Sequence, residues 1–222
     1  MNVAIYMLTR DRLEYTKRAL SSLLLRTRMN FSLSILDNGS TDGTQDYLSQ
    51  ACERNPNIDL HFEKENIGIH AMSKIAQRHF SNFDLVFKVD NDCEFTHDVI
   101  TPITKIYDQA INKKMILSPR VEGIVNQPRR IYTVDTGDHK FGMTGHVGGL
   151  CMAMPNHIFS NMHIETSLPK AKGFDSNVCS CANSMGYTIG YIEDLSVWHM
   201  DGTHEQAKKY PEYFKRKMEE EK

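Results

Sequence analysis

The chain has 222 residues, of which 40% are hydrophobic and 24% charged, with a formal net charge of -2. This composition predicts a globular protein with one sizeable core. The charge provides no basic excess to drive binding to nucleic acid, although it leaves a local basic patch open. No segment approaches the roughly 20 apolar residues of a membrane span, and the start of the chain lacks the features of a signal peptide. The five cysteines are odd in number and show no zinc-knuckle spacing, as is typical of reduced thiols. We therefore expect a single cytoplasmic domain over residues 1–222.

The first half of the chain alternates between β-forming apolar runs and helical apolar patterns. Strands are predicted over residues 2–8, 31–36, 58–62 and 85–89. Helices are predicted over residues 12–27 and 69–80, with another that passes through Tyr47 and ends near Arg54. Each strand runs into a polar loop. Repeated strand–helix units predict an α/β fold with a mostly parallel central sheet flanked by helices.

The second half is less regular. The predicted elements are a helix over 100–110, strands over 115–118 and 148–154, helices over 156–162 and 175–185, a strand over 188–192 and an extended piece at 196–199. Residues 119–147 are rich in Arg, Gln, Pro and Gly, and we expect a long loop, part of which is mobile until it orders over a ligand. The charged tail, residues 205–222, is predicted to be a solvated helical flank.

An acidic tripeptide, Asp90-Asn91-Asp92, follows the apolar strand 85–89. In an open α/β sheet, ligands bind at the carboxyl ends of the strands, so a carboxylate pair there is suited to hold Mg²⁺ or Mn²⁺ on a diphosphate. The alternative is a solvated turn that caps the helix beginning near Thr96, because Asp and Asn favour turns and caps.

Four stretches together resemble the GT-A-type glycosyltransferases of family 2, which transfer a sugar from a nucleotide diphosphate donor. They are Leu36-Asp-Asn-Gly-Ser-Thr-Asp-Gly-Thr44, Asn66-Ile-Gly68, the DxD-like Val89-Asp-Asn-Asp92, and the run from Gly173-Phe-Asp through Met-Gly-Tyr187 to Val-Trp-His199. The resemblance implies a single GT-A domain. Its nucleotide-sugar-binding half would be residues 1–118, its acceptor-binding and catalytic half 119–203, and its charged C-terminal helix 204–222.

The resemblance also implies which residues bind the donor, with a UDP-sugar favoured. They are Thr9, Arg10, Asp37, Asn38, Asn66, Gly68, Lys74, Asp90 and Asn91. Asp37 is placed at a strand end to accept a hydrogen bond from a nucleobase imide, or it is merely a helix cap. The helix after Asn66-Ile-Gly68 holds Met72, Ser73 and Lys74 where the family has a basic residue, which puts diphosphate contacts from that helix in doubt.

The implied metal, Mn²⁺ or Mg²⁺, would be held by Asp92 and His199. A metal-binding histidine at the end of the last strand is a habit of the family, so His199 is a candidate ligand. A lone histidine is also a common structural hydrogen-bonding residue, and that alternative stays open.

Asp175 is the candidate general base, because it falls where the family carries a Glu-Asp pair whose Asp deprotonates the acceptor hydroxyl. A helix N-terminus would hold its carboxylate ionised. The alternatives are that Asp175 is an N-cap, or that Glu193 and Asp194 supply the base. The sequence departs from the family at Phe174 and at Asn177, where acidic residues are usual.

Gly148 and Gly149 would let an acceptor sugar approach the backbone, or they form a turn before a strand. These expectations predict an inverting, metal-dependent glycosyltransferase that acts on an acceptor hydroxyl of a glycan, a protein or a modified nucleic acid. The alternatives are a nucleotidyltransferase and a non-catalytic module that binds sugars or nucleotides. Nucleotidyltransferases usually bind the triphosphate with a glycine-rich basic loop after the first strand. The loop Thr9-Arg-Asp-Arg12 has no glycine, which disfavours this alternative.

Overall fold

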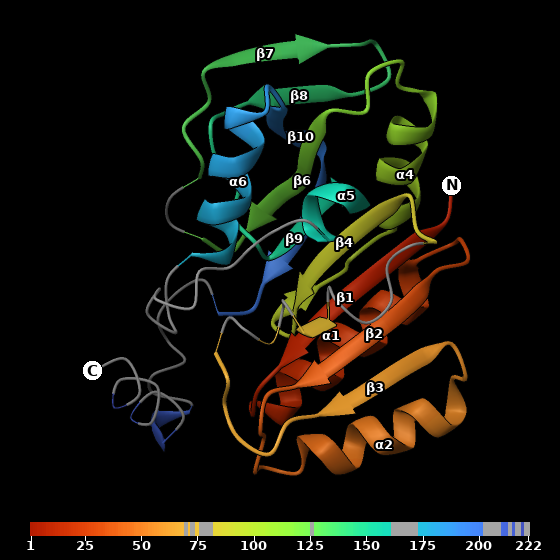
Figure 1. The fold of residues 1–222 in the computed structure, drawn as a ribbon, viewed down its shortest axis with the longest axis vertical. Helices are drawn as coiled ribbons and strands as arrows, with labels where there is room; N and C mark the ends of the chain where they lie inside the picture. The colour runs from red at the N-terminus through yellow and green to blue at the C-terminus, as the bar shows by residue number, and fades with distance from the viewer. Residues whose placement is uncertain are drawn as a thin grey trace.

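The computed structural model describes residues 1–68, 71, 74–75, 82–124, 127–160, 173–201, 210–212, 215 and 219. Within these residues, ten strands form one twisted sheet in the order β3-β2-β1-β4-β9-β6-β10-β8-β7, with β5 paired to β10. The sheet runs the length of the molecule, and helices lie on both of its faces (Figure 1). The α/β architecture predicted from the strand–helix alternation is confirmed, with a sheet that is mixed beyond β4.

The first half is a parallel βα arrangement close to the predicted one. Its elements are β1 (Val3–Thr9), α1 (Leu13–Arg26), β2 (Ser32–Asp37), α2 (Thr44–Arg54), β3 (Ile58–Phe62) and β4 (Leu85–Asp90). β1 pairs in parallel with both β2 and β4, and β2 pairs in parallel with β3. The predicted helix over 69–80 lies largely outside the described residues, and its described members Ala71, Lys74 and Ile75 are helical.

The second half contains more strands than expected. Its elements are β5 (Cys93–Glu94), α4 (Ile100–Gln109), β6 (Met115–Glu122), β7 (Tyr132–Asp135), β8 (Lys140–Met143), β9 (Cys151–Pro155), α5 (Asn156–Ser160), α6 (Phe174–Ser184) and β10 (Thr188–His199). The prediction of one long loop over 119–147 is wrong, because β6 extends to Glu122 and β7 and β8 form an antiparallel hairpin. The two extended pieces predicted near the end are one strand, β10, with a register shift between Ile192 and Ser196.

Alternation along the central strands divides the core into two layers. On β1, Ile5 and Met7 face a cluster that includes residues of α1, α2 and α4, whereas Ala4 and Tyr6 face a cluster formed with α5 and α6. Tyr6 stacks on Phe159 of α5, with ring centroids 5.0 Å apart. This two-sided burial explains why the central strands are almost continuously apolar.

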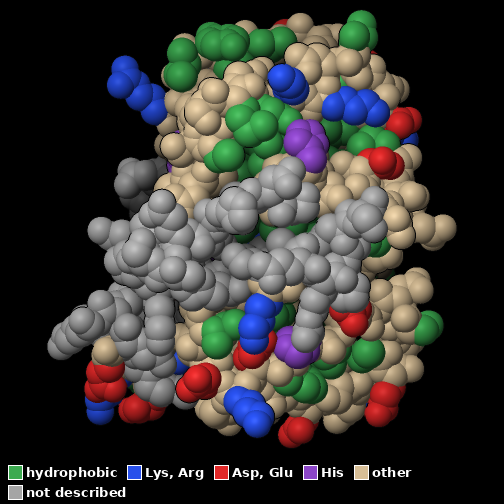
Figure 2. All heavy atoms as spheres, in the orientation of Figure 1, with side chains coloured by type: hydrophobic (Ala, Val, Ile, Leu, Met, Phe, Trp, Pro, Cys, Tyr) green, Lys and Arg blue, Asp and Glu red, His purple; other side chains and the backbone are tan. Residues whose placement is uncertain are grey.

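The surface and the tail add two observations. Hydrophobic side chains gather along the upper edge of the molecule over β7 (Figure 2), where Ile131, Tyr132 and Val134 are exposed. Tyr210, one of the few described tail residues, packs edge-on against Tyr15 of α1. Among the described residues, no helix is both long and apolar enough to cross a membrane.

Candidate active site

Asp37, at the carboxyl end of β2, is the centre of a buried hydrogen-bond network. Its Oδ1 accepts bonds from the backbone N–H of Ser40 (2.9 Å) and from Gln45 Nε2 (2.8 Å). Its Oδ2 accepts from Thr9 Oγ1 at 2.8 Å and from the Ser40 hydroxyl. Thr9 and Asp37 are fully buried, so the carboxylate locks the ends of β1 and β2 to the turn that begins α2.

A second network joins that turn to the segment after β3. Asn38 Oδ1 accepts from the Ile67 N–H at 2.8 Å, and Asn38 Nδ2 donates to Asn66 Oδ1 at 2.8 Å. Asn66 Oδ1 also accepts from the N–H of Gly68 at 2.9 Å. Thus Asn38, from the turn after β2, meets Asn66 and Gly68, from the segment after β3, at one edge of the sheet.

Gly39 makes this junction possible. Its φ is +76°, and a Cβ there would lie 2.8 Å from the backbone carbon of Glu65. Any side chain would therefore combine left-handed strain with a backbone clash.

Arg12 binds the acidic tripeptide from the side. Its Nη1 lies 3.0 Å from Asp92 Oδ2 and 3.0 Å from Asp201 Oδ2, and its Nη2 donates to Asn91 Oδ1 at 2.7 Å. Burial would raise the pKa of Asp92, but the hydrogen bonds and charges of His199 and Arg12 outweigh burial and hold that pKa well below its usual range. Asp92 is therefore a carboxylate, and the tripeptide is a structured site.

His199, the last residue of β10, completes this cluster. Its Nε2 lies 3.4 Å from Asp92 Oδ2, and the N–H of the next residue, Met200, donates to the Asp92 carbonyl at 2.9 Å. Burial lowers the pKa of His199, but the hydrogen bond to Asp92 and the neighbouring carboxylates raise it above its ordinary value.

The donor set of this cluster fits a divalent cation in part. A carboxylate oxygen and an imidazole nitrogen on one side suit a cation that also takes phosphate oxygens and water. Within the part of the chain that the structure describes, no three His, Cys, Asp or Glu side chains gather as a metal site. Of the residues that the structure describes, Asp92 and His199 are the pair that would hold such a cation.

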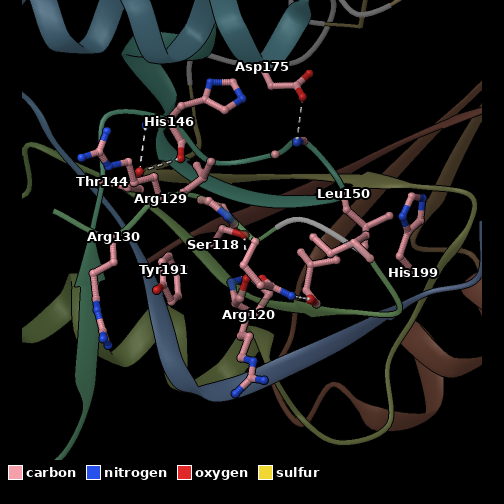
Figure 3. Close-up of a pocket in the computed structure, with 18 of the residues that line it drawn as sticks. Ser118, Arg120, Arg129, Arg130, Thr144, His146, Leu150, Asp175, Tyr191 and His199 are labelled. Atoms are coloured by element: carbon pink, nitrogen blue, oxygen red, sulfur yellow. Dashed lines mark hydrogen bonds between the residues drawn. The ribbon is translucent and has the colours of Figure 1, made fainter. Parts of the chain in front are cut away.

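A cavity of about 850 Å³ opens beside this cluster. Asp90, Gly148, Gly149, Asp175 and His199, all predicted site residues, line it. Figure 3 shows Asp175 entering from α6 and His199 from β10, while arginines occupy the other side. The volume lies in the usual range of about 300–1,000 Å³ for ligand pockets.

Gly149 connects the candidate base to a buried lysine. Its N–H donates to Asp175 Oδ2 at 3.0 Å, and its carbonyl accepts from Lys88 Nζ at 2.6 Å. Lys88 also lies 2.5 Å from Asp90 Oδ1. A Cβ on Gly149 would lie 2.8 Å from Lys88 Nζ and 3.0 Å from Asp175 Cγ, so a residue with a side chain would push these groups apart.

Lys88 and Asp90 in this group respond differently to burial and to the neighbouring charges. Burial would lower the pKa of Lys88, but Asp90 and Asp175 outweigh burial and raise it, so the amine is charged. Burial raises the pKa of Asp90, and the charges of Asp92 and Asp175 raise it further, whereas Lys88 lowers it.

Gly173, in the left-handed region, is the N-cap residue of α6, so the alternative that Asp175 is the N-cap is wrong.

The remaining predicted residues lie elsewhere or act locally. Lys74 pairs with Glu63 at 2.8 Å, and Arg10 is partly buried in the loop after β1. Gly148 and Gly149 precede β9, which begins at Cys151 and not at Gly148. Asn91, predicted to bind the donor, donates to Thr16 Oγ1 at 3.0 Å and so anchors α1.

Arg12 and Lys88 are among the site residues that the sequence reasoning missed. Lys88 had a signal, since a lysine in the middle of the buried strand Leu85–Asp90 needs a partner. Arg12 had none, because its partners lie about 80 and 190 residues along the chain and come together through the fold alone.

Residues 4–140 match the model of the family described as glycosyl transferase family 2. The match spans more than half of the chain, which therefore belongs to glycosyl transferase family 2. No curated protein matches the chain significantly.

Solved structures show the same fold at low sequence identity. GalNAc-T7 with UDP, GalNAc and Mn²⁺ superimposes with a TM-score of 0.71 at 12% identity, over 89% of this chain and 43% of that chain. For the mannosyltransferase PcManGT from Pyrobaculum calidifontis, in complex with GDP-Man and Mn²⁺, the TM-score is 0.64 at 14% identity. The superposition covers 89% of this chain and 56% of that chain. For residues 1–349 of S. aureus TarS with UDP-GlcNAc, the TM-score is 0.66 at 14% identity. The superposition covers 91% of this chain and 61% of that chain.

These likenesses confirm the predicted GT-A fold. The chain spans between 43% and 61% of the length of the three solved chains. The activities of those proteins therefore do not transfer with the fold.

Proposed function

We propose that the chain is an inverting, metal-dependent glycosyltransferase that moves a sugar from a nucleotide diphosphate sugar, with a UDP-sugar favoured, to an acceptor hydroxyl. The observation that carries the proposal is the convergence of Asp175, Asp90 and His199 on one cavity, in a chain that belongs to glycosyl transferase family 2. Solved relatives of the fold that hold UDP or GDP-Man support the donor class.

In the proposed reaction the Asp175 carboxylate takes the proton of the acceptor hydroxyl. The hydroxyl oxygen attacks the anomeric carbon of the donor sugar, on the side opposite the diphosphate. The bond from that carbon to the phosphate oxygen breaks, and the nucleoside diphosphate leaves with the electron pair. A single in-line displacement of this kind inverts the configuration of the sugar.

The N–H of Gly149 keeps Asp175 in place for this role. That hydrogen bond, 3.0 Å long, fixes the direction of the carboxylate, which lies in the first turn of α6. Bound at Asp92 and His199, Mn²⁺ or Mg²⁺ would neutralise the charge that develops on the leaving diphosphate.

The rival bases are engaged elsewhere. Glu193 Oε1 pairs with Arg130 Nη1 at 2.7 Å, and Asp194 Oδ2 lies 2.6 Å from His139 Nδ1. Neither residue lines the cavity that holds Asp175. Both lie within the register shift of β10 between Ile192 and Ser196.

The test compares kcat and donor affinity of Asp175→Asn with those of Glu193→Gln and Asp194→Asn. Loss of a positioned base should lower kcat by about 10² to 10⁴ and leave donor affinity nearly unchanged, while the two control variants keep their kcat. A fully active Asp175→Asn would refute the assignment, and loss of donor binding would move Asp175 to the donor site.

The metal role is tested on the same protein without turnover. UDP should raise the Tm further when Mn²⁺ is present, and Asp92→Asn should remove this extra increment. Because the increment is a difference within each variant, any change in intrinsic stability from the lost Arg12 pair cancels. An unchanged increment would remove Asp92 from the metal site.

A further inference from the structure

The side of the cavity away from His199 is basic. Arg120 on β6 and Arg129 and Arg130 before β7 line the same cavity as Asp175. Figure 3 shows Arg129 and Arg130 on the side of the cavity opposite His199, and Arg120 below Ser118 and Tyr191. The three guanidinium groups come from two segments that the sheet brings together.

These charges are largely uncompensated. Neither Arg120 nor Arg129 forms an ion pair with any carboxylate that the structure describes, and Arg130 pairs with Glu193 at 2.7 Å. Arg120, Arg130 and Glu193 also line an adjoining cavity of about 300 Å³. On the other side, Asp90 is neutralised by Lys88 at 2.5 Å. The basic side therefore carries a surplus of positive charge.

We propose that this basic side binds an anionic group, a phosphate or a carboxylate, carried by the acceptor saccharide. The inference rests on the proposed function, because it takes the saccharide whose hydroxyl meets Asp175 as the acceptor. Guanidinium groups hold phosphate and carboxylate oxygens through paired N–H donors, which gives direction as well as charge.

The order of the strands separates this subsite from the donor contacts predicted at Thr9 and Asp37. The donor contacts predicted at Thr9 and Asp37 lie at the ends of β1 and β2, whereas Arg120 lies on β6, and β4 and β9 stand between β1 and β6. At about 4.8 Å per strand, β6 is roughly 14 Å from β1. An anion at Arg120 is therefore a different group from the part of the donor predicted to bind at Thr9 and Asp37.

Packing under the subsite supports a built surface. Tyr191 on β10 lines both cavities and lies over Gly142 of β8, where a Cβ would meet the Tyr191 ring. The glycine thus lets the ring lie close to the sheet. An aromatic face in a cavity that arginine side chains also line suits a sugar ring that bears an anion.

The test measures binding of three probes: glucose 6-phosphate, glucuronate and glucose. Each is titrated into the protein with saturating UDP and Mn²⁺, so that phosphates cannot report on the donor site. The variants are Arg120→Gln, Arg129→Gln and their double, and the matched control is Lys140→Gln. Lys140 is an exposed cation on β8 that lies 3.7 Å from Asp135 and does not line the cavity.

The anionic probes should bind at least about tenfold more tightly than glucose, because each charge-assisted hydrogen bond adds measurably to affinity. Each Arg→Gln variant should lose about tenfold for the anionic probes and little for glucose, and Lys140→Gln should change neither. If only glucose 6-phosphate binds more tightly than glucose, the acceptor carries a phosphate. If glucuronate binds as tightly as glucose 6-phosphate, the subsite accepts either a phosphate or a carboxylate.

Two results would overturn the inference. One is equal binding of glucose and the anionic probes, or a preference that survives the double variant. The other is loss of UDP affinity in the arginine variants, which would assign the arginines to the donor diphosphate. Failure of the proposed function is seen separately, as absence of Mn²⁺-dependent UDP binding and of sugar release from UDP-sugars in the unaltered protein.

Discussion

The two halves of the sheet satisfy their polar side chains in opposite ways. At the ends of β1 and β2, Thr9, Asp37 and Asn38 are buried and bonded to one another and to the adjoining turns. Around the cavity of the second half, Arg120 and Arg129 are exposed and have no carboxylate partner among the described residues. The polar side chains at the ends of β1 and β2 are thus satisfied within the protein, whereas Arg120 and Arg129 are not paired with any described carboxylate.

This difference predicts where substitutions act. Changes in the network at the ends of β1 and β2 should act on folding, because Asp37 and Asn38 each bond several other groups. Changes around the cavity should act on turnover or acceptor affinity with little loss of stability. The predictions below test that division, in order of decreasing effect.

Asp37→Asn should cause the largest loss. The amide cannot accept from Ser40, Gln45 and Thr9 together, so buried donors are left unsatisfied. We expect the free energy of unfolding to fall by about 3 kcal/mol or more, measured by urea denaturation.

The control for Asp37→Asn is Asp108→Asn, an exposed carboxylate in the last turns of α4. It should change stability by less than about 0.5 kcal/mol. If both variants were equally stable, the network around Asp37 would contribute nothing to folding, and the contrast between the two halves would fail.

A pair of glycine substitutions sharpens the comparison. Gly39 and Gly137 both have positive φ, +76° and +86°, but a Cβ on Gly39 would meet the Glu65 backbone at 2.8 Å, whereas a Cβ on Gly137 meets nothing within 4 Å. Both Ala variants should lose about 1 kcal/mol to left-handed strain. Gly39→Ala should lose about 1–3 kcal/mol more, from the clash. Equal Tm values would show that the junction at Gly39 yields without cost.

The first half could be predicted well because its signals are local. Buried parallel strands are apolar throughout, and each is followed by a helical pattern, so β1, β2, β3 and β4 were placed within a residue or two. The loops at their carboxyl ends follow from the same pattern. What the sequence could not supply was the pairing across those loops, such as Arg12 with Asp92.

The second half was harder because its strands lack a buried face or are interrupted. All four residues of β7 are exposed, so no apolar alternation marks the strand, and β8 contains Gly142, a residue that suggests a loop. The register shift after Ile192 in β10 resembles the end of a strand. The sequence reasoning also missed the basic side of the cavity. Arg120 and Arg129 line one cavity only because the fold brings β6 and the segment before β7 together.

The smallest change in the free energy of unfolding is expected for Gly149→Ala, whose effect should appear in kcat. In Gly149→Ala the new methyl group would lie 2.8 Å from Lys88 Nζ and 3.0 Å from Asp175 Cγ, so both side chains must shift by tenths of an ångström. Displacing a positioned base by this much should lower kcat about tenfold, equal to about 1.4 kcal/mol in the barrier. Because Lys88 Nζ is the end of a flexible chain, the Tm should change little.

Gly145→Ala, whose Cβ meets nothing within 4 Å, is the matched control and should keep its kcat. If Gly149→Ala lost stability and kept its kcat, the bond from Gly149 to Asp175 would serve the fold and not the reaction.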